Sequence, residues 1–168
     1  MIGDRGAPVA GPRVLDQAGT DDLEALVAID VSGQHWTREA FSSELGKVPP
    51  TLYCLRGGES GVLGFAVVRI AGTDLDIVNL AIAPGYRLQG LGRSLLRLVL
   101  DGAISSGVTS AFLEARASNQ AALALYASLG FKETQRRRNF YASPTEDGVL
   151  MSCRIEPRPG LNDARTAC

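Results

Sequence analysis

The sequence predicts a fold of the α/β (α+β) class, with a mixed central β-sheet of about six to seven strands flanked by about four helices. Three observations predict it. Segments rich in β-branched residues alternate with segments whose apolar residues recur at helical spacing. In the middle of the chain, consecutive strands are separated only by glycine-containing turns, which indicates an antiparallel meander. In the second half, helices separate the strands, so the sheet is expected to be mixed.

The N-terminal region predicts one strand followed by a helix. A short strand is expected near Arg13–Leu15. Thr20 is placed to cap the helix, and Asp21 and Asp22 in its first turn put negative charge at the positive end of the helix dipole. The apolar stripe of this helix ends at Gly33, a residue type that often follows a helix.

A second helix and three strands come next. The helix is expected over Thr37–Leu45, with Thr37 as its cap and Gly46 at its end. Beyond it, the composition changes to β-branched residues interrupted by glycine-rich turns. The predicted strands of this meander are Thr51–Leu55, Gly61–Ile70 and Leu75–Ile82.

The second half of the chain alternates helices with strands. Pro84 and Gly85 stop the preceding strand, and Leu88–Ser106 predicts a long helix with leucines along one face. The remaining predicted elements are a strand over Ser110–Arg116, a helix over Asn119–Leu129, and strands over Phe131–Gln135 and Val149–Ile155.

Length and composition indicate one soluble domain. The chain has 168 residues, 45% of them hydrophobic and 21% charged, with a net charge of −1. These values are ordinary for a globular protein and give no general attraction to nucleic acid or membranes. No apolar run approaches the length of a membrane span, and a secretory N-terminus is lacking, so a cytoplasmic location is expected. Residues 1–12 and 156–168 are expected to be poorly ordered tails around a domain of residues 13–155.

Cysteine and histidine usage argues against a metal site. Cys54, Cys153 and Cys168 form an odd set with spacings that match neither a disulfide framework nor a metal cluster. His35 is the only histidine in the sequence, so a histidine-rich site is excluded and no metal is expected.

The segment between the third meander strand and the long helix has the character of an anion site. Gly90 and Gly92 remove side chains where a phosphate must approach the first amides of a helix, and Arg87 and Arg93 add positive charge. The segment lacks the lysine of a P-loop and the spacing of a dinucleotide fold. A glycine-containing turn that merely begins a helix is the alternative.

At this point the chain resembles the GCN5-related N-acetyltransferase (GNAT) superfamily. The acetyl-CoA signature of that family, Gln/Arg-x-x-Gly-x-Gly/Ala, is met by Arg87, Gly90 and Gly92. The resemblance extends from Asp76 to Met151 and is strongest to the ribosomal-protein-alanine N-acetyltransferase (RimI-type) branch. The segments that carry it are Asp76–Pro84, Leu113–Ala122, Leu125-Tyr126, Leu129–Phe131 and Arg136–Tyr141.

The resemblance implies the GNAT fold and acetyl-CoA as co-substrate. It assigns the pantetheine arm to a strand backbone, the pyrophosphate to the turn before the long helix, and the region near the thioester to an asparagine. The residues so assigned are Leu80, Ala81, Ile82, Arg87, Leu88, Gln89, Gly90, Leu91, Gly92, Arg93 and Asn119. On the residues alone, Leu80–Ile82 also fits an ordinary central strand, and Asn119 an ordinary helix cap.

Two residues are predicted to move protons. Glu114 lies inside an apolar strand, where a carboxylate needs a partner or a task. It is either paired with Arg116 on the same strand face or the general base that takes a proton from the incoming amine. Tyr126 lies on an apolar helical stripe, which suits a core tyrosine, whereas the resemblance implies a proton donor to the departing CoA sulfur.

Reference pKa values show which acceptor amine is easier to deprotonate. Making a free α-amine neutral at pH 7 costs about 1 kcal/mol, whereas a lysine costs roughly 4.6 kcal/mol. A tyrosine that fully protonates a thiolate works uphill by about 2 kcal/mol, so a strengthening hydrogen bond from Tyr126 is expected instead.

The resemblance also indicates where the acceptor lies. The connection Val31–Trp36 and the segment Arg136–Tyr141 are expected to flank it, with Trp36 and Tyr141 as walls for the first residue of a peptide. Arg136–Arg138 is either a solvated basic edge or a specificity device. The expected partner is a protein N-terminus, in particular an alanine-starting ribosomal protein. A small amine as acceptor, and a non-catalytic acyl-CoA-binding module, are the alternatives.

Overall fold

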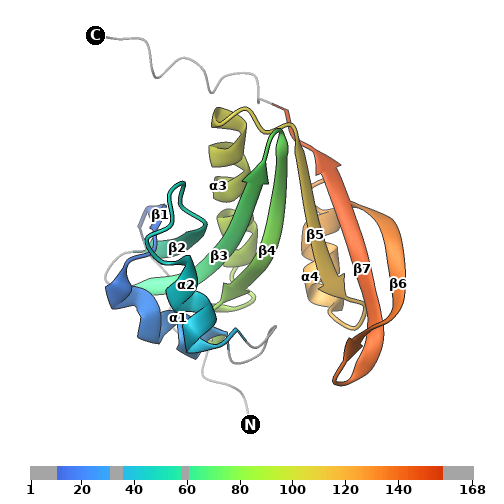
Figure 1. Cartoon of the computed structure of the whole chain (residues 1–168), viewed down its shortest axis with the longest axis horizontal. Coiled ribbons are helices and arrows are strands. Elements are labelled where there is room, and N and C mark those ends of the chain that lie inside the picture. Colours follow the sequence, from blue (N-terminus) through green and yellow to red (C-terminus); the bar gives the residue numbers. More distant parts are fainter. Residues whose placement is uncertain (1–10, 31–35, 58–60, 157–168) are drawn as a thin grey trace.

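The computed structural model describes residues 11–30, 36–57 and 61–156, which form a layered α/β structure (Figure 1). The strands are β1 (Arg13–Gln17), β2 (Leu52–Gly57), β3 (Val62–Ala71), β4 (Asp74–Ile82), β5 (Ser110–Arg116), β6 (Lys132–Ala142) and β7 (Thr145–Arg154). The α-helices are α1 (Leu23–Ile29), α2 (Arg38–Glu44), α3 (Leu91–Ser105) and α4 (Gln120–Ala127). The predicted fold class is confirmed.

All the strands belong to one mixed sheet in the order β1-β2-β3-β4-β5-β7-β6. The meander predicted from the middle of the chain is confirmed, because β2, β3 and β4 pair antiparallel in sequence order. The sole parallel pair among the described strands joins β4 to β5, and β7 then lies between β5 and β6. The antiparallel alternation of the sheet is therefore interrupted in its middle, between β4 and β5.

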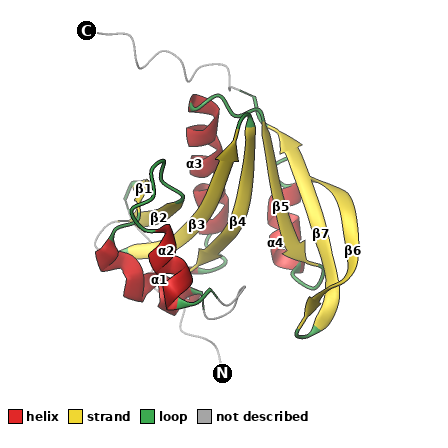
Figure 2. Ribbon diagram, viewed as in Figure 1, coloured by secondary structure: helices red, strands yellow, loops and turns green. Residues whose placement is uncertain are grey.

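Helices cover both faces of the sheet, as Figure 2 shows. α1 and α2 lie over the β2 to β4 part of one face, where Leu26, Phe41 and Phe65 are completely buried. On the opposite face α3 and α4 cover a larger apolar cluster that includes Leu95 and Leu96. Burying each such side chain stabilises the fold by about 1.5–3 kcal/mol. Within the described residues, no helix has the length and apolar character of a membrane span.

The first helix departs from its prediction. A 3-10 turn occupies Thr20–Asp22, and α1 follows it. Thr20 is therefore not the cap; the carboxylate of Asp22 instead accepts a hydrogen bond from the Gly19 amide at 2.8 Å. α1 ends at Ile29, whereas the predicted end, Gly33, lies outside the described residues. A polar residue before an apolar stripe could not reveal which side chain turns back toward the backbone.

The second and third helices agree with prediction in kind and differ at one boundary. Thr37 caps α2 by accepting a hydrogen bond from the Ala40 amide at 3.2 Å, as expected. The long helix begins at Leu91, three residues later than predicted. Leu88 and Gly90 adopt φ values of 60° and 77°, so the segment before Leu91 is a loop. Positive φ is incompatible with a helical turn, which explains the later start.

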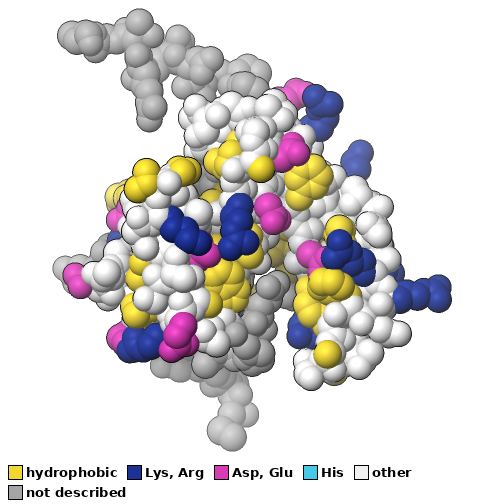
Figure 3. All heavy atoms as spheres, viewed as in Figure 1, with side chains coloured by type: hydrophobic (Ala, Val, Ile, Leu, Met, Phe, Trp, Pro, Cys, Tyr) yellow, Lys and Arg dark blue, Asp and Glu magenta, His cyan; other side chains and the backbone are white. Residues whose placement is uncertain are grey.

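The last two strands are much longer than the predicted Phe131–Gln135 and Val149–Ile155. β6 continues to Ala142 and thus contains the segment Arg136–Tyr141, which was expected to lead into the hairpin. β6 is an edge strand that is exposed along most of its length, and Figure 3 shows Lys and Arg side chains on the side of the molecule formed by β6 and β7. Its polar composition therefore gave no apolar strand pattern in the sequence. The predicted tails, residues 1–12 and 156–168, lie almost entirely outside the described residues.

Candidate active site

The site begins where the two parallel strands separate. Pairing between β4 and β5 runs from Asp74 opposite Ser110 to Ile77 opposite Leu113 and then stops, and the two ribbons diverge (Figure 1). A register shift in the pairing with β3 leaves Val78 as an extra residue, a β-bulge at the point of divergence. Beyond it, the polar groups of β4 that face β5 have no partner strand among the described residues. Such a gap in a sheet is where a ligand can pair with backbone.

A groove of about 800 Å³ occupies the gap between β4, the N-terminus of α3, and α4. It takes in most of the predicted cofactor residues: Leu80, Ala81, Ile82, Arg87, Leu88, Gly90, Leu91, Gly92, Arg93 and Asn119. Gln89 is the exception, since its side chain turns away and donates a hydrogen bond to the Gly85 carbonyl at 3.4 Å. The groove brings together residues that are widely separated in sequence.

The N-terminus of α3 forms one end of this groove and is suited to an anion. Gly90 is its N-cap with φ 77°, and no side chain from the described residues caps it. A Cβ on Gly92 would lie 3.1 Å from Leu125 Cδ2, so a larger residue would press against α4 at the edge of the groove. The first amides of the helix therefore remain open to a ligand, and the helix dipole favours a negative one.

The two arginines of this segment behave differently. Arg87 donates from Nε to the Ile82 carbonyl at 2.9 Å, so part of its side chain holds the loop against β4. Arg93 is exposed at the rim of the groove. The positive charge at the groove thus comes from two guanidinium groups, of which one is anchored in the fold and the other faces solvent.

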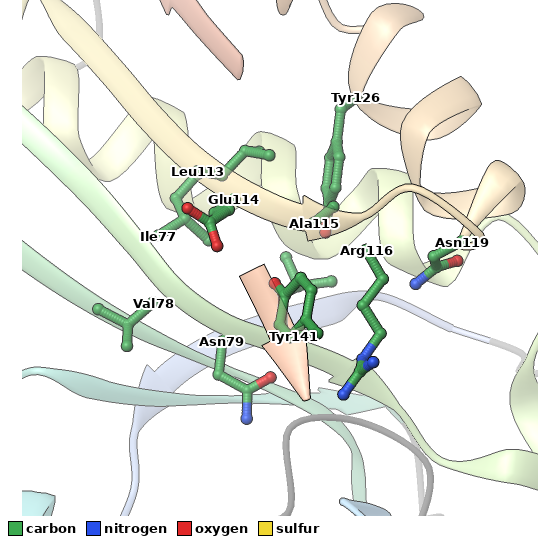
Figure 4. A pocket seen from close by; sticks show the side chains of 11 residues that line it. Ile77, Val78, Asn79, Leu113, Glu114, Ala115, Arg116, Asn119, Tyr126 and Tyr141 are labelled. Atoms are coloured by element: carbon green, nitrogen blue, oxygen red, sulfur yellow. The ribbon is translucent and has the colours of Figure 1, made fainter. Parts of the chain in front are cut away.

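A second, smaller cavity of about 100 Å³ adjoins the groove. Glu114, Tyr126 and Tyr141 line it (Figure 4). Figure 4 shows the Glu114 carboxylate on β5, the Tyr126 ring descending from α4, and Tyr141 between Glu114 and Arg116. Three residues line both spaces, namely Leu80, Arg116 and Asn119. A molecule lying in the groove can therefore present its end to Glu114 and Tyr126.

The expected alternative for Glu114, an ion pair with Arg116, is wrong. Glu114 Oε2 lies 3.2 Å from Arg137 Nη1 on β6. Arg116 instead pairs with Glu146 at 2.7 Å, and its guanidinium stacks over the Tyr141 ring at 4.2 Å. The two side chains share a strand face but turn to different neighbours, and the hairpin of β6 and β7 supplies a partner for each.

Both tyrosines keep their protons firmly. Burial, followed by the nearby Tyr141, raises the pKa of Tyr126 to about 12. Burial is also the main reason that the pKa of Tyr141 is raised, and the negative charge of Glu114 and a hydrogen bond to it add to the effect. The cavity thus holds two phenol donors beside the Glu114 side chain.

Asn119 caps its helix and also lines both spaces. Its side chain caps α4 by accepting a hydrogen bond from the Ala122 amide at 3.2 Å. It also lines the groove and the small cavity at their junction. The cap holds the amide group in place where the two spaces meet.

Of the two expected walls of the acceptor site, Tyr141 lines the small cavity and Trp36 does not. The Trp36 ring packs against Phe41 with centroids 5.4 Å apart, on the α2 side of the sheet. Its amide donates to Asp30 at 2.6 Å, and Asp30 also accepts from Asn79 at 3.3 Å. Trp36 is therefore tied to the strand next to the cavity through Asp30. The rest of the predicted flanking connection, residues 31–35, lies outside the described residues.

Sequence reasoning missed Asn79 and Gly148 and did not connect Arg137 with Glu114. Asn79 is a polar residue within an apolar strand, which is a signal that could have drawn attention to it. Arg137 and Gly148 approach Glu114 only because β7 and β6 fold against β5. The local sequence around these two residues does not predict that they approach Glu114.

Comparison with known proteins agrees with this geometry. The family model for the acetyltransferase (GNAT) family matches residues 21–131. Ribosomal protein bS18-alanine N-acetyltransferase of Salmonella typhimurium is 42% identical over 140 residues, 81% of this chain and 93% of the relative. The same-named protein of Escherichia coli (strain K12) is 38% identical over 131 residues, 77% of this chain and 86% of the relative.

A solved structure shows the same arrangement of elements. The crystal structure of the ribosomal-protein-S18-alanine N-acetyltransferase from Escherichia coli superposes with a TM-score of 0.76 at 32% identity, covering 89% of this chain and 98% of the other. Because the family model, the relatives and this structure all span most of the sequence, the chain belongs to the GNAT acetyltransferase family and is an acetyl-CoA-dependent N-acetyltransferase.

Proposed function

We propose that this enzyme acetylates the N-terminal α-amine of a protein, with the alanine-starting ribosomal protein S18 as its acceptor. The observation that carries the proposal is the junction of the two spaces: a groove suited to a nucleotide-bearing ligand opens onto a small cavity with one carboxylate and two phenols. The names of the relatives supply the identity of the acceptor.

The residues of the groove fit acetyl-CoA. The open amides at the N-terminus of α3, next to Gly90 and Gly92, are suited to bind its pyrophosphate. The unpaired edge of β4 over Leu80–Ile82 can hydrogen-bond the amides of its pantetheine arm. Asn119 lies where the arm would end. When bound, acetyl-CoA supplies an acetyl group activated as a thioester.

Glu114 is the proposed general base. Its carboxylate lines the cavity in which the acceptor amine must lie. A free α-amine is already close to neutral at physiological pH, so the base needs only to remove a proton as the nitrogen attacks. Glu114 can do this directly or through a water molecule.

Tyr126 is the proposed hydrogen-bond donor to the leaving sulfur. With a pKa of about 12 against about 8.5 for a thiol, complete proton transfer from this tyrosine is uphill by roughly 5 kcal/mol. A hydrogen bond that strengthens as charge develops costs no such transfer. Tyr126 therefore acts by stabilising charge.

The size of the cavity favours a small first residue in the acceptor. Its volume is about 100 Å³, against about 800 Å³ for the groove. Tyr141 and Asn79 close two of its sides. An amine with a methyl side chain suits this space better than one with a large side chain.

Thiol release from acetyl-CoA tests the proposal. The enzyme should release CoA when it is given a peptide with the N-terminal sequence of S18. It should release none with the same peptide carrying an acetylated N-terminus. Replacing the first alanine with leucine should lower kcat/KM by about 10-fold or more. Turnover with a small polyamine or aminoglycoside, but not with the peptide, would contradict the proposed acceptor.

Glu114→Gln tests the proposed base separately. Kd for CoA should stay within about twofold of the wild-type value, because the residue lies outside the groove, while kcat falls by about 100-fold. An unchanged rate at several pH values would remove Glu114 from the mechanism.

A further inference from the structure

The carboxylate of Glu114 is held by a residue two strands away. Glu114 is on β5 and Arg137 on β6, with β7 lying between them in the sheet. Gly148 of β7 is paired with Arg116 on one side and with Arg137 on the other. The ion pair at 3.2 Å therefore reaches across an intervening strand at the level of Gly148.

Gly148 leaves the space through which Glu114 reaches Arg137. A Cβ at this position would lie 3.0 Å from Glu114 Oε1 and 3.1 Å from Phe140 Cδ1. The backbone of Gly148 is not in the left-handed region, so its conformation suits any residue. A side chain at this position would therefore have to displace the Glu114 carboxylate or the Phe140 ring by a few tenths of an ångström.

Aromatic side chains hold the guanidinium on its other side. Arg137 Cζ lies 5.0 Å from the centroid of the Phe140 ring, close enough for a cation–π contact. Phe140 in turn meets Tyr141 edge-to-face at 5.1 Å. Tyr141 lines the acceptor cavity together with Glu114. The carboxylate is thus flanked by a cation and by a notch in the sheet.

We infer that Arg137 and Gly148 are positioning residues that hold the Glu114 carboxylate toward the acceptor amine, an inference that rests on the proposed role of Glu114 as base. A glutamate side chain has several rotamers, and an unheld carboxylate is directed at the cavity for only part of the time. Confining it makes each encounter with the amine productive, and displacements of about 1 Å can cost about 100-fold in rate. The alternative is that Arg137 and Glu114 form an ordinary, half-exposed surface ion pair, which contributes little to stability.

The test measures kcat, KM for the peptide and Kd for CoA in Arg137→Met and Gly148→Ala. Each should lower kcat by about 10-fold while KM and Kd stay within about twofold, because neither residue lines the groove or the cavity. Arg137→Lys keeps a charge but loses the planar guanidinium, and should recover part of the rate. Arg136→Ala is the matched control: this neighbouring arginine pairs with Glu133 on the exposed edge and should have the wild-type rate.

The same variants in the Glu114→Gln background separate positioning from general damage. If Arg137 and Gly148 act through Glu114, their substitution should lower the residual rate of Glu114→Gln by less than about twofold. Equal losses in both backgrounds, or wild-type kcat in both Arg137→Met and Gly148→Ala, would overturn the inference while leaving Glu114 as base. A wild-type rate for Glu114→Gln itself would instead remove the proposed base and the inference together.

Discussion

At the scale of single residues, the cavity gives its ionisable groups their tasks through burial and neighbours. Tyr126 is about nine-tenths buried, and this burial keeps its proton in place far above neutral pH. Glu114, in contrast, forms an ion pair with Arg137 and lines the cavity beside Tyr141. One side chain is thereby suited to donate a hydrogen bond and the other to accept a proton.

Tyr126→Phe should lower kcat by about 10- to 100-fold, the range expected for losing one hydrogen bond to developing charge. Kd for CoA should change little, since the hydroxyl lines the small cavity and not the groove. Steady-state kinetics with calorimetric titration of CoA checks both. Because the pKa of Tyr126 is raised to about 12, its ionisation should produce no fall in wild-type activity up to about pH 10. A fall near pH 8 to 10 that Tyr126→Phe abolishes would contradict this.

At the scale of elements, α3 carries two distinct functions along its length. Its N-terminus presents open amides to the groove, and its middle packs Leu95, Leu96 and Val99 against the sheet. Loss of packing would unfold the domain, whereas a change at the first turn acts on the ligand. Substitutions in the first turn and in the middle of α3 therefore test different properties of one helix.

Gly90→Glu should weaken CoA binding by about 100-fold or more, because it places a negative charge where the pyrophosphate must approach. The left-handed φ of 77° at this position adds a local strain of about 1–2 kcal/mol. Isothermal titration measures the affinity, and thermal melting measures the stability. Retention of wild-type affinity in a folded Gly90→Glu variant would remove the pyrophosphate from this turn.

Gly102→Ala should stabilise the protein by about 0.5–1 kcal/mol. Gly102 is exposed within α3, and a Cβ placed on it meets no atom within 4 Å. Denaturant unfolding of the apo protein checks the change. CoA affinity should be unaffected, which makes this variant a helix control for Gly90→Glu. A loss of stability would show that the helix does not extend through this position.

At the scale of the whole molecule, ion pairs tie the N-terminal elements to the sheet. Arg56 on β2 binds Asp16 on β1 at 2.9 Å and Asp22 in the turn before α1 at 2.8 Å. The hydrogen bond from Arg56 is the main reason that the pKa of Asp22 is lowered. Asp22 is nearly buried, so losing its partner leaves a carboxylate with little water to replace it.

Arg56→Met should lower the free energy of unfolding at pH 7 by about 1–3 kcal/mol. The lowered pKa of Asp22 in the folded state means that its contribution is present above the unfolded value of about 3.9 and is lost as pH falls through the folded value. The wild-type protein should therefore lose stability below about pH 4, and the variant should lose less over the same interval. Urea unfolding from pH 7 to pH 3 measures both slopes; equal slopes would contradict the assignment to Asp22.

The amino-acid sequence determined the elements whose signals are local. The meander, the long helix and its glycine turn, and the Thr37 cap all follow from period, composition and residue type, and the structure agrees with them. The signature of Arg87, Gly90 and Gly92 likewise depends on neighbouring residues only. A motif whose residues all lie within one turn can be recognised from the sequence of that turn alone.

The tertiary structure alone decided how distant residues meet. β6 is long because β7 pairs with it, which its own exposed, polar residues do not indicate. Arg137 rather than Arg116 holds Glu114, because strand order brings β6 within reach across Gly148. Which strands pair depends on the free energy of the whole sheet. The local sequence of one strand contains only one member of each residue pair.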